Sequence, residues 1–498
     1  MFRVRTTKTF SNATAVQIVR YAFGKKIIVK HIGSAHTAQE LILLKEAASK
    51  WIEKSTHQQT LFPHGKKQTD FFKNTYRYLG FRYTLIYDGI HQLFHQFQFG
   101  KLDPFLLDLV LVRIMQPVSK LESVELLFDF FGVKYQRTDL YRGIPAFISL
   151  KRIIESTVVT VARNNFSFDF SIVFYDVTTL YFESFKEDPE EFKKPGFSKD
   201  NKANQPQIII GLIVTKEGFP VSYEVFAGNT FEGKTFIPTI VKFKKKYEVK
   251  NLTVVADAAM ISFPNVQSLI ANNLSYIVGA RMAGLKHGQI MQISKDLDCV
   301  DGSSTRIETE RGLLVCDFSF KRYQKDKREI EKQIVKAEKL LEKKEGVKRT
   351  KFIKNKDDKR TEQILNTELI EKTKLLLGIK GYYTNLTDET NETIITQYHN
   401  LWHVELALRI AKSDLAMRPI YHFKKQTIEA HILICFMALA VCKYMELKTG
   451  KSTKKIIKLL RSITEARVLN MITNEEIIMR QDLTEEVKQL LITLCIRY

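Results

Sequence analysis

The sequence has few cysteines and no long apolar run, and both absences narrow the classes of protein that it can encode. Five cysteines occur in 498 residues. Their number is odd and none forms a C-x-x-C pair, which argues against a disulfide scaffold and against a zinc ribbon. The longest uninterrupted apolar run, residues 432–442, is far shorter than the roughly 20 residues of a membrane-spanning helix. We therefore expect this run to form a buried helix, and we expect no membrane partner.

Acidic residues are too few to balance the basic ones. Lys and Arg number 77 and Asp and Glu number 55, which gives a formal net charge of +22. This excess favours a polyanionic partner, nucleic acid before a membrane surface, although a Lys-rich compositional bias would also produce it. The first residues, MFRVRTTKTF, include no apolar stretch, so no secretory signal is visible. Together with the few cysteines, these features predict a cytoplasmic protein.

The chain is too long for one compact core, and changes of pattern divide it into six segments. Residues 1–36 alternate like short strands that turn at Gly24. Residues 37–165 have helical periodicity, punctuated by Pro117 and Gly132. This second segment is either a DNA-binding domain or a helical packing domain without DNA contacts. The remaining segments are expected to be a catalytic core at 166–281 and 398–446, an insertion at 282–397, and C-terminal helices at 447–498.

From residue 167 the apolar periodicity becomes that of a sheet. Three strand-like runs come first, SFDFSIVFYDVTTLYF, QPQIIIGLIVT and FPVSYEVFAGN, with Gly218 at the turn between the last two. A helix, a strand, a helix and a strand follow in KTFIPTIVKFKKKY, LTVVADAAM, PNVQSLIANN and SYIVGAR. A three-strand meander followed by this alternation is the order of a ribonuclease-H-like domain. We therefore predict an α/β fold with a ribonuclease-H-like catalytic domain.

Residues 282–397 interrupt this predicted domain. Short strand-like pieces, SSTRIETE, GLLVCDFSF and GIKGYYTNL, flank a charged stretch at 321–360 that holds 17 Lys and Arg against 8 Asp and Glu. Its middle part, EIEKQIVKAEKLLEKK, has the i,i+4 charge pairing of a helix and few apolar residues. We expect a β-rich insertion with a basic helical arm, which is either solvated or follows DNA phosphates.

Two aspartates occupy matching places in two predicted strands. Asp176 and Asp257 each follow a run of apolar or small residues, in the first and the fourth strand. A carboxylate buried there needs a cation or hydrogen-bond donors. Neighbouring carboxylates repel each other unless metal ions hold them, and Mg²⁺ is the type of cation that prefers such oxygen ligands.

A helix after the insertion offers a third carboxylate. In YHNLWHVELALRIAKSDL, one stripe with helical spacing is apolar and is expected to pack on the sheet: Leu401, Val404, Leu408, Ala411 and Leu415. A second stripe, rotated by one residue, carries an acid, two cations and two aromatics: Tyr398, Trp402, Glu405, Arg409 and Lys412. We expect Glu405 to join the two aspartates, although a surface ion pair with Arg409 would also explain it.

These motifs resemble those of DDE transposases of bacterial insertion sequences, of the insertion-sequence-four type. The third-acid signature of that family is Tyr-x2-Arg-x3-Glu-x6-Lys. Tyr398, Glu405 and Lys412 match it at that spacing, while Leu401 stands at the Arg position. The segments FYDVTTLYFE, VVADAAMIS and RPIYH…IEAHILICFMAL resemble the long-element subgroup. Arg409, one turn past Glu405, is the candidate to replace the missing Arg.

The resemblance implies a transposase that binds the terminal inverted repeats of its element, cleaves the DNA and transfers a strand to target DNA. Asp176, Asp257 and Glu405 would hold two Mg²⁺ ions, with Mn²⁺ able to substitute. One ion would activate the attacking water or 3′-hydroxyl, and the other would stabilise the leaving oxygen. Tyr398 and Lys412 would position phosphates without reading bases.

Further contacts and partners complete this hypothesis. Trp402 either stacks on an unpaired base near the cut or is a core residue, and Arg281, at the end of the fifth strand, is a candidate phosphate contact. The partner is double-stranded DNA, both element ends and target. A homodimer is expected on DNA because two ends must be held together; the C-terminal helices either pair the subunits or pack within the chain. The alternatives are a structure-specific nuclease of the same fold and a catalytically inactive DNA-binding protein derived from a transposase.

Overall fold

The computed structural model describes residues 2–10, 12–22, 24–56, 76–183, 192–196, 205–260, 262–342, 351–355 and 363–498. The chain forms two compact units, Met1–Phe81 with Glu465–Arg480 and Arg82–Thr464 with Gln481–Tyr498. The smaller unit thus joins segments from both ends of the sequence, whereas the larger one contains every predicted site residue. The division into six segments remains a prediction.

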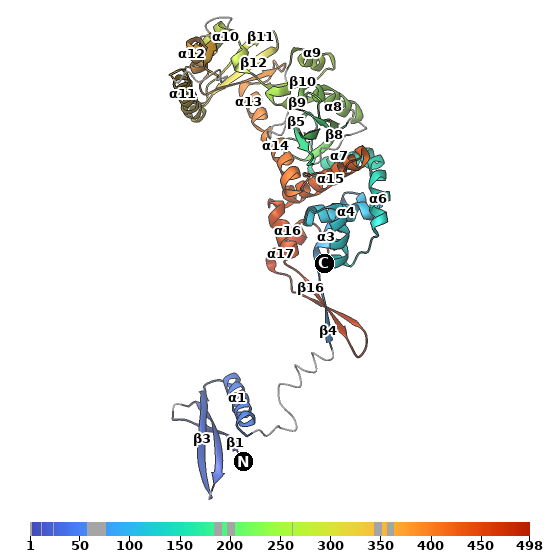
Figure 1. The fold of residues 1–498 in the computed structure, drawn as a ribbon, viewed down its shortest axis with the longest axis vertical. Helices are drawn as coiled ribbons and strands as arrows, with labels where there is room; N and C mark the ends of the chain where they lie inside the picture. Colours follow the sequence, from blue (N-terminus) through green and yellow to red (C-terminus); the bar gives the residue numbers. More distant parts are fainter. Residues whose placement is uncertain are drawn as a thin grey trace. The chain divides into compact units, whose positions relative to one another are not determined.

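The smaller unit begins with an antiparallel sheet and one helix (Figure 1). Its elements are β1 (Phe2–Lys8), β2 (Thr14–Ala22), β3 (Lys25–Ala35) and α1 (Ala38–Thr56). Gly24 has φ +70° in the turn between β2 and β3, a conformation that glycine adopts at little cost. Val16, Ile18 and Ala48 form a small core where α1 packs on the sheet. The expected N-terminal strands are confirmed.

A second sheet of the smaller unit pairs distant parts of the chain. It has the order β17-β16-β4. Its strands are β4 (Tyr76–Arg82), β16 (Glu465–Asn470) and β17 (Glu476–Arg480). The β16–β17 hairpin is a correction, because only helices were expected after residue 446.

Helices make up the part of the larger unit that precedes and follows the central sheet. They are α3 (Thr84–Gln96), α4 (Pro104–Met115), α5 (Lys120–Phe131), α6 (Arg137–Ala146), α7 (Lys151–Phe166), α15 (Lys425–Thr449), α16 (Thr453–Arg461) and α17 (Glu485–Thr493). Capping fixes two of their boundaries. Asp103 accepts from the backbone N of Phe105 at the start of α4, and Gly132 ends α5 with φ +73°. The helices predicted for residues 37–165 are confirmed for α1 and for α3 to α7. Strand β4 falls in the same predicted helical segment and is a correction, because it pairs with β16.

Helix α15 is the core helix of this unit. Among the described residues, α15 is the one helix that is long enough and apolar enough to cross a membrane. However, 89% of its most apolar stretch is buried inside the protein. It packs against α4, and its residues from Ala430 to Cys442 are all buried. This burial confirms that the apolar run at 432–442 is a buried helix.

The central sheet has nine strands in the order β11-β12-β15-β10-β9-β5-β7-β6, with β8 paired to β7. Its first strands and their helices are β5 (Ile172–Tyr181), β6 (Lys194–Pro195), β7 (Pro206–Val214), β8 (Pro220–Ala227), α8 (Glu232–Lys246), β9 (Thr253–Ala256), α9 (Phe263–Ala271) and β10 (Ser275–Gly279). Strands β5, β7 and β8 are antiparallel neighbours, whereas β9 is parallel to both β5 and β10. Apart from the two-residue β6, these elements follow the predicted order, and the fold is a mixed α/β fold.

The insertion extends this sheet. Its elements are α10 (His287–Leu297), β11 (Ser304–Thr309), β12 (Gly312–Phe318), α11 (Phe320–Glu342), β13 (Ile353–Asn355), β14 (Gln363–Leu365), α12 (Thr367–Leu375) and β15 (Ile379–Thr384). Strand β15 pairs with both β10 and β12. The expected strands therefore belong to the central sheet, and α11 is the described part of the basic arm; residues 343–350 and 356–362 lie outside the described residues.

The helix expected to carry the third acid is divided into three parts, of which Figure 1 labels α13 and α14. They are α13 (Asn391–His399), α14 (Trp402–Arg409) and a π-helix (Ile410–Asp414). Between α13 and α14 the backbone makes i→i+3 bonds, from Leu401 N to Tyr398 O at 3.0 Å and from His403 N to Asn400 O at 3.0 Å. Asn400, a weak helix former, lies at this break. One continuous helix was expected, so this division is a correction.

Candidate active site

The two predicted aspartates lie next to each other where the parallel pairing of β5 with β9 ends, Asp176 in the middle of β5 and Asp257 directly after β9. The register pairs Phe174 with Val255 and Tyr175 with Ala256. Continuing this register by one residue places Asp176 beside Asp257. Asp176 is half-buried, whereas Asp257 is exposed directly after the last residue of β9. The expectation that both acids are buried within strands is therefore wrong for Asp257, because β9 is only four residues long.

The side of the sheet that Asp176 faces follows from its neighbours. The Tyr175 hydroxyl is 2.8 Å from Thr235 Oγ1 on α8, and successive side chains of a strand point to opposite faces. Asp176 therefore points away from α8. On this opposite face, Leu212, the β7 neighbour of Asp176, pairs with Tyr223, whose ring lies 4.9 Å from that of Phe436 on α15. Helix α14 packs against β5 and β7.

Tyr398 links the helical segment to Asp257. Its hydroxyl donates to Asp257 Oδ1 at 3.5 Å, and the backbone N of Ala258 donates to the same oxygen at 2.7 Å. Tyr398 is buried against Gly279, where an added Cβ would lie 2.4 Å from the Tyr398 hydroxyl oxygen. Burial raises the pKa of Tyr398, and the charges of Asp257 and Glu405 raise it further. The hydroxyl therefore stays protonated at neutral pH and remains a hydrogen-bond donor, and it lies close enough to both acids for their charges to affect it.

The two predicted stripes differ in burial largely as expected. The apolar stripe is confirmed, because Leu401, Val404, Leu408, Ala411 and Leu415 are all at most 5% exposed. In the second stripe, Glu405 and Arg409 are exposed. Trp402 is 51% exposed and its ring stacks on that of His403, 3.9 Å away. The interpretation of Trp402 as a core residue is therefore wrong.

The remaining predicted contacts lie on two different elements. Lys412 is half-buried within the π-helix, a helix type that often marks functional sites. Arg281 is exposed two residues after the end of β10. Since Val278 pairs with Ala256, the end of β10 lies beside Asp257. Arg281 thus lies at the same edge of the sheet as the aspartates.

The donor set suits a hard divalent cation, because all three predicted ligands are carboxylates. Among the residues that the structure describes, however, no group of three or more His, Cys, Asp or Glu side chains is close enough to hold a metal ion. Asp176 and Asp257 are neighbours, and the charges of Glu405 and Asp257 both raise the pKa of Tyr398. The arrangement brings the acids to one region without closing a three-ligand cluster.

Sequence reasoning missed a lysine at this site. Lys380 of β15 is half-buried and its Nζ lies 4.5 Å from the centre of the Tyr398 ring. Burial lowers the pKa of Lys380, and the charge of Arg322 lowers it further. The carboxylates of Asp257, Glu405 and Asp317 oppose this shift. The side chain of Lys380 is therefore close enough to two of the three predicted acids, Asp257 and Glu405, for their charges to affect its pKa.

A buried acid of the insertion supports this lysine. Asp317 is the cross-strand partner of Lys380 and accepts a hydrogen bond of 2.7 Å from the Tyr382 hydroxyl. Arg322 follows it at the start of α11. The sequence contains no local signal for this group, because its members meet only through the pairing of β12 with β15.

Comparison with known proteins bears on the same region. A family model described as the transposase DDE domain matches residues 152–441, a range that contains Asp176, Asp257 and Glu405. No curated protein matches the chain. Among solved structures, the chain is similar to the piggyBac transposase in its synaptic complex with hairpin DNA, with 10% sequence identity over 76% of this chain and 77% of that chain and a TM-score of 0.39.

Proposed function

Because the matched domain spans more than half of the sequence, the chain belongs to the DDE transposase family, and we propose that it is the transposase of an insertion sequence. In this proposal it binds the terminal inverted repeats of its own element, cleaves the DNA and transfers a strand to target DNA. The observation that carries the proposal is the side-by-side placement of Asp176 and Asp257. Glu405 lies in the same region, because its charge and that of Asp257 both raise the pKa of Tyr398. Its motifs favour the long-element subgroup of the bacterial insertion-sequence-four type.

The strand order supports a ribonuclease-H-like core. Strands β8, β7, β5, β9 and β10 are consecutive neighbours in the sheet, with β5, β9 and β10 parallel. This order places the middle of β5, where Asp176 lies, beside the carboxyl end of β9, which Asp257 follows. The insertion strands β11, β12 and β15 then extend the β10 side of that core.

We assign the carboxylates Asp176, Asp257 and Glu405 to divalent metal binding, with Mg²⁺ as the expected ion and Mn²⁺ as a substitute. Bound metal would supply an activated oxygen nucleophile and stabilise the leaving oxygen during phosphodiester cleavage. Tyr398 was expected to position a phosphate. Because it is buried and its hydroxyl donates to Asp257, the proposed role is instead to orient this carboxylate. Lys380 lies where its ammonium can bind the phosphate that approaches these acids, and charge-assisted contacts of this kind are the strong ones.

Groups around the acids would hold the DNA. Trp402 exposes its ring next to Glu405 in α14, which suits stacking on an unpaired base. Arg409, Lys412 and Arg281 would contact phosphates, which fixes register without reading sequence. The net charge of +22 favours double-stranded DNA as the partner, both as element ends and as target.

Assembly and location are further parts of the proposal. A homodimer on DNA would hold two element ends together in the bacterial cytoplasm, at the nucleoid. The C-terminal helices use apolar side chains for packing within the same chain, since Ile456, Leu460, Val487 and Leu490 are buried there. Their intramolecular packing was the alternative expectation, and any dimer contact is proposed to lie elsewhere.

The test is a nicking assay on a duplex that carries the element's terminal repeat. Glu405→Gln keeps the shape of the side chain and removes its charge. Nicking and strand transfer should fall by several orders of magnitude, while a gel-shift assay shows near wild-type DNA binding. Asp176→Asn and Asp257→Asn should behave alike, and the losses should be non-additive because the three acids act as a unit. Mn²⁺ binding, followed by electron paramagnetic resonance, should weaken in each variant.

The matched control is Glu392→Gln, which changes an exposed glutamate of α13. It should leave nicking and Mn²⁺ binding unchanged. Normal cleavage by Glu405→Gln would show that the third acid lies elsewhere. Equal loss of binding and cleavage in all three variants would instead indicate a DNA-binding protein without this chemistry.

A further inference from the structure

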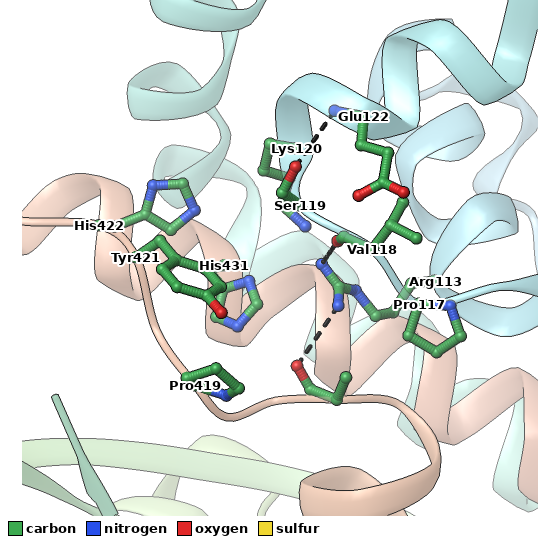
Figure 2. Close-up of a pocket in the computed structure, with 11 residues that line it drawn as sticks. Arg113, Pro117, Val118, Ser119, Lys120, Glu122, Pro419, Tyr421, His422 and His431 are labelled. Carbon is green, nitrogen blue, oxygen red and sulfur yellow. Dashed lines mark hydrogen bonds between the residues drawn. The ribbon is translucent and has the colours of Figure 1, made fainter. Parts of the chain in front are cut away.

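A pocket outside the carboxylate site gathers basic side chains from two distant stretches of the chain. It has a volume of about 430 Å³ and lies between the α4–α5 connection and residues 416–431. Figure 2 shows Arg113 and Lys120 on one side and His422 and His431 on the other. The lining includes one acidic residue, Glu122, and it is exposed. The pocket therefore has an excess of positively charged or protonatable groups.

Lys120 is the unusual member of this group. It is the first residue of α5 and is only 5% exposed. Among the described residues its Nζ has no hydrogen-bond partner. A buried ammonium without a counter-ion is strongly unfavourable. Burial lowers the pKa of Lys120, and the charge of Arg113 lowers it further. A bound anion would remove this cost.

Arg113 is held at the pocket wall without being neutralised. It is 4% exposed, and its terminal nitrogens donate to the backbone oxygens of Leu415, Ala416 and Val118 at 3.4, 3.3 and 3.1 Å. Its Nε has no hydrogen-bond partner in the described part of the chain. Carbonyl groups satisfy the terminal nitrogens but leave the Nε donor and the positive charge of the guanidinium, so a negative ligand is still favoured here.

The two histidines add protonatable nitrogen atoms to the opposite side. Their rings are 5.5 Å apart. His431 Nε2 is 3.0 Å from the Met417 carbonyl oxygen, while its Nδ1 has no partner among the described residues. A nearby anion favours the protonated form of an imidazole, in which both ring nitrogens donate.

We propose that this pocket binds a phosphate group. A phosphate offers several strong acceptor oxygens, which match the unpartnered donors of Lys120 and Arg113. The first turn of α5, capped by Ser119, adds the positive end of a helix. The volume falls in the range of small-molecule sites, about 300–1,000 Å³, so the phosphate can carry an attached group. Its source is either the backbone of bound DNA or a free phosphate-bearing molecule.

The test measures binding of inorganic phosphate to the full chain by isothermal titration calorimetry, at constant ionic strength with chloride as the balancing anion. Lys120→Met keeps an unbranched side chain and removes the ammonium. The variant should bind phosphate about 10- to 100-fold more weakly, as expected for lost charge-assisted hydrogen bonds. It should remain folded, because an apolar side chain replaces a buried charge.

The matched control is Lys101→Met, which removes an exposed lysine of the same unit and should bind phosphate like the wild type. Two outcomes would overturn the proposal: wild-type protein without saturable phosphate binding, or Lys120→Met with unchanged affinity. The first needs no variant, so the proposal stays testable even if Lys120→Met misfolds.

A second measurement identifies the source of the phosphate. The salt dependence of terminal-repeat binding should lose about 0.9 from its log–log slope in Lys120→Met if the pocket holds one DNA phosphate. An unchanged slope, together with weakened phosphate binding, assigns the pocket to a free phosphate-bearing molecule. Only this measurement rests on the proposed transposase function. Failure of that function would therefore leave the calorimetric result standing.

Discussion

The close contact between Gly279 and Tyr398 offers a quantitative test of how the site is packed. In Gly279→Ala the new Cβ would lie 2.4 Å from the Tyr398 hydroxyl oxygen, 3.2 Å from its Cζ and 3.2 Å from the backbone N of Ala258. The first distance is well inside van der Waals contact, so the tyrosine has to move. Because that hydroxyl donates to Asp257, the movement would also withdraw a donor from a predicted metal ligand.

The size of the effect follows from the atoms involved. Overpacking a well-packed core costs about 1–3 kcal/mol, and we expect Gly279→Ala to fall in this range. Tyr398→Phe removes the oxygen that clashes and one hydrogen bond, at a cost of about 0.5–1.5 kcal/mol. In the double variant the worst contact no longer exists. Its loss should therefore be smaller than the sum of the single losses by about 1 kcal/mol or more.

The assay is urea unfolding of the wild type, both single variants and the double variant, read as a double-mutant cycle. Gly284→Ala is the matched control, since an added Cβ there meets nothing within 4 Å. It should change stability little. Additive losses in the cycle, or a Gly279→Ala variant as stable as Gly284→Ala, would refute this packing of Tyr398 against β10.

Two further predictions concern the helical part of the larger unit. Burial and the charges of Lys120 and Arg113 lower the pKa of His422 to about 4, and the pKa of the neighbouring His431 is also lowered. Between pH 6.5 and 4 the unfolded chain therefore binds more protons than the native one, so the free energy of unfolding should decrease by about 1–3 kcal/mol as the pH is lowered. Denaturation curves measured without phosphate should show a smaller decrease for His422→Asn. An equal decrease in the variant and the wild type would contradict the assignment. Leu460 of α16 is fully buried, so Leu460→Ala should lower the free energy of unfolding by about 2–5 kcal/mol. Lys458→Ala, on the exposed face of the helix, should change it little. If Leu460→Ala left thermal unfolding unchanged, α16 would again be a candidate surface for subunit contact.

Local periodicity was enough to predict most elements of the fold. Alternating and continuous apolar runs located β5, β7, β8, β9 and β10, because burial of one or both faces of a strand leaves a pattern in the sequence itself. The stripe from Leu401 to Leu415 predicted which side of the helical segment is buried. The same pattern placed Asp176 inside the first predicted strand and Asp257 after an apolar run in the fourth.

Other features depend on contacts that no local pattern records. The break at Asn400 exposes Trp402 while it leaves Tyr398 buried, and a continuous helical repeat does not predict it. The β16–β17 hairpin is defined by its pairing with β4, which lies almost 400 residues away in the sequence. Its strands are short, and the helical patterns on either side of them led to the prediction of helices only.

The sequence by itself determined the family and the mixed α/β class, and it predicted the three acids, because motif spacing and apolar periodicity are local properties. Tertiary structure alone decided which cations stand beside them. Lys380 reaches Tyr398 because β15 pairs with β10, and the basic pocket exists because residues 113–120 meet residues 416–431. Such groups are brought together by the order of strands and the packing of helices. The same side chains, read along the chain, are indistinguishable from ordinary surface lysines and core histidines.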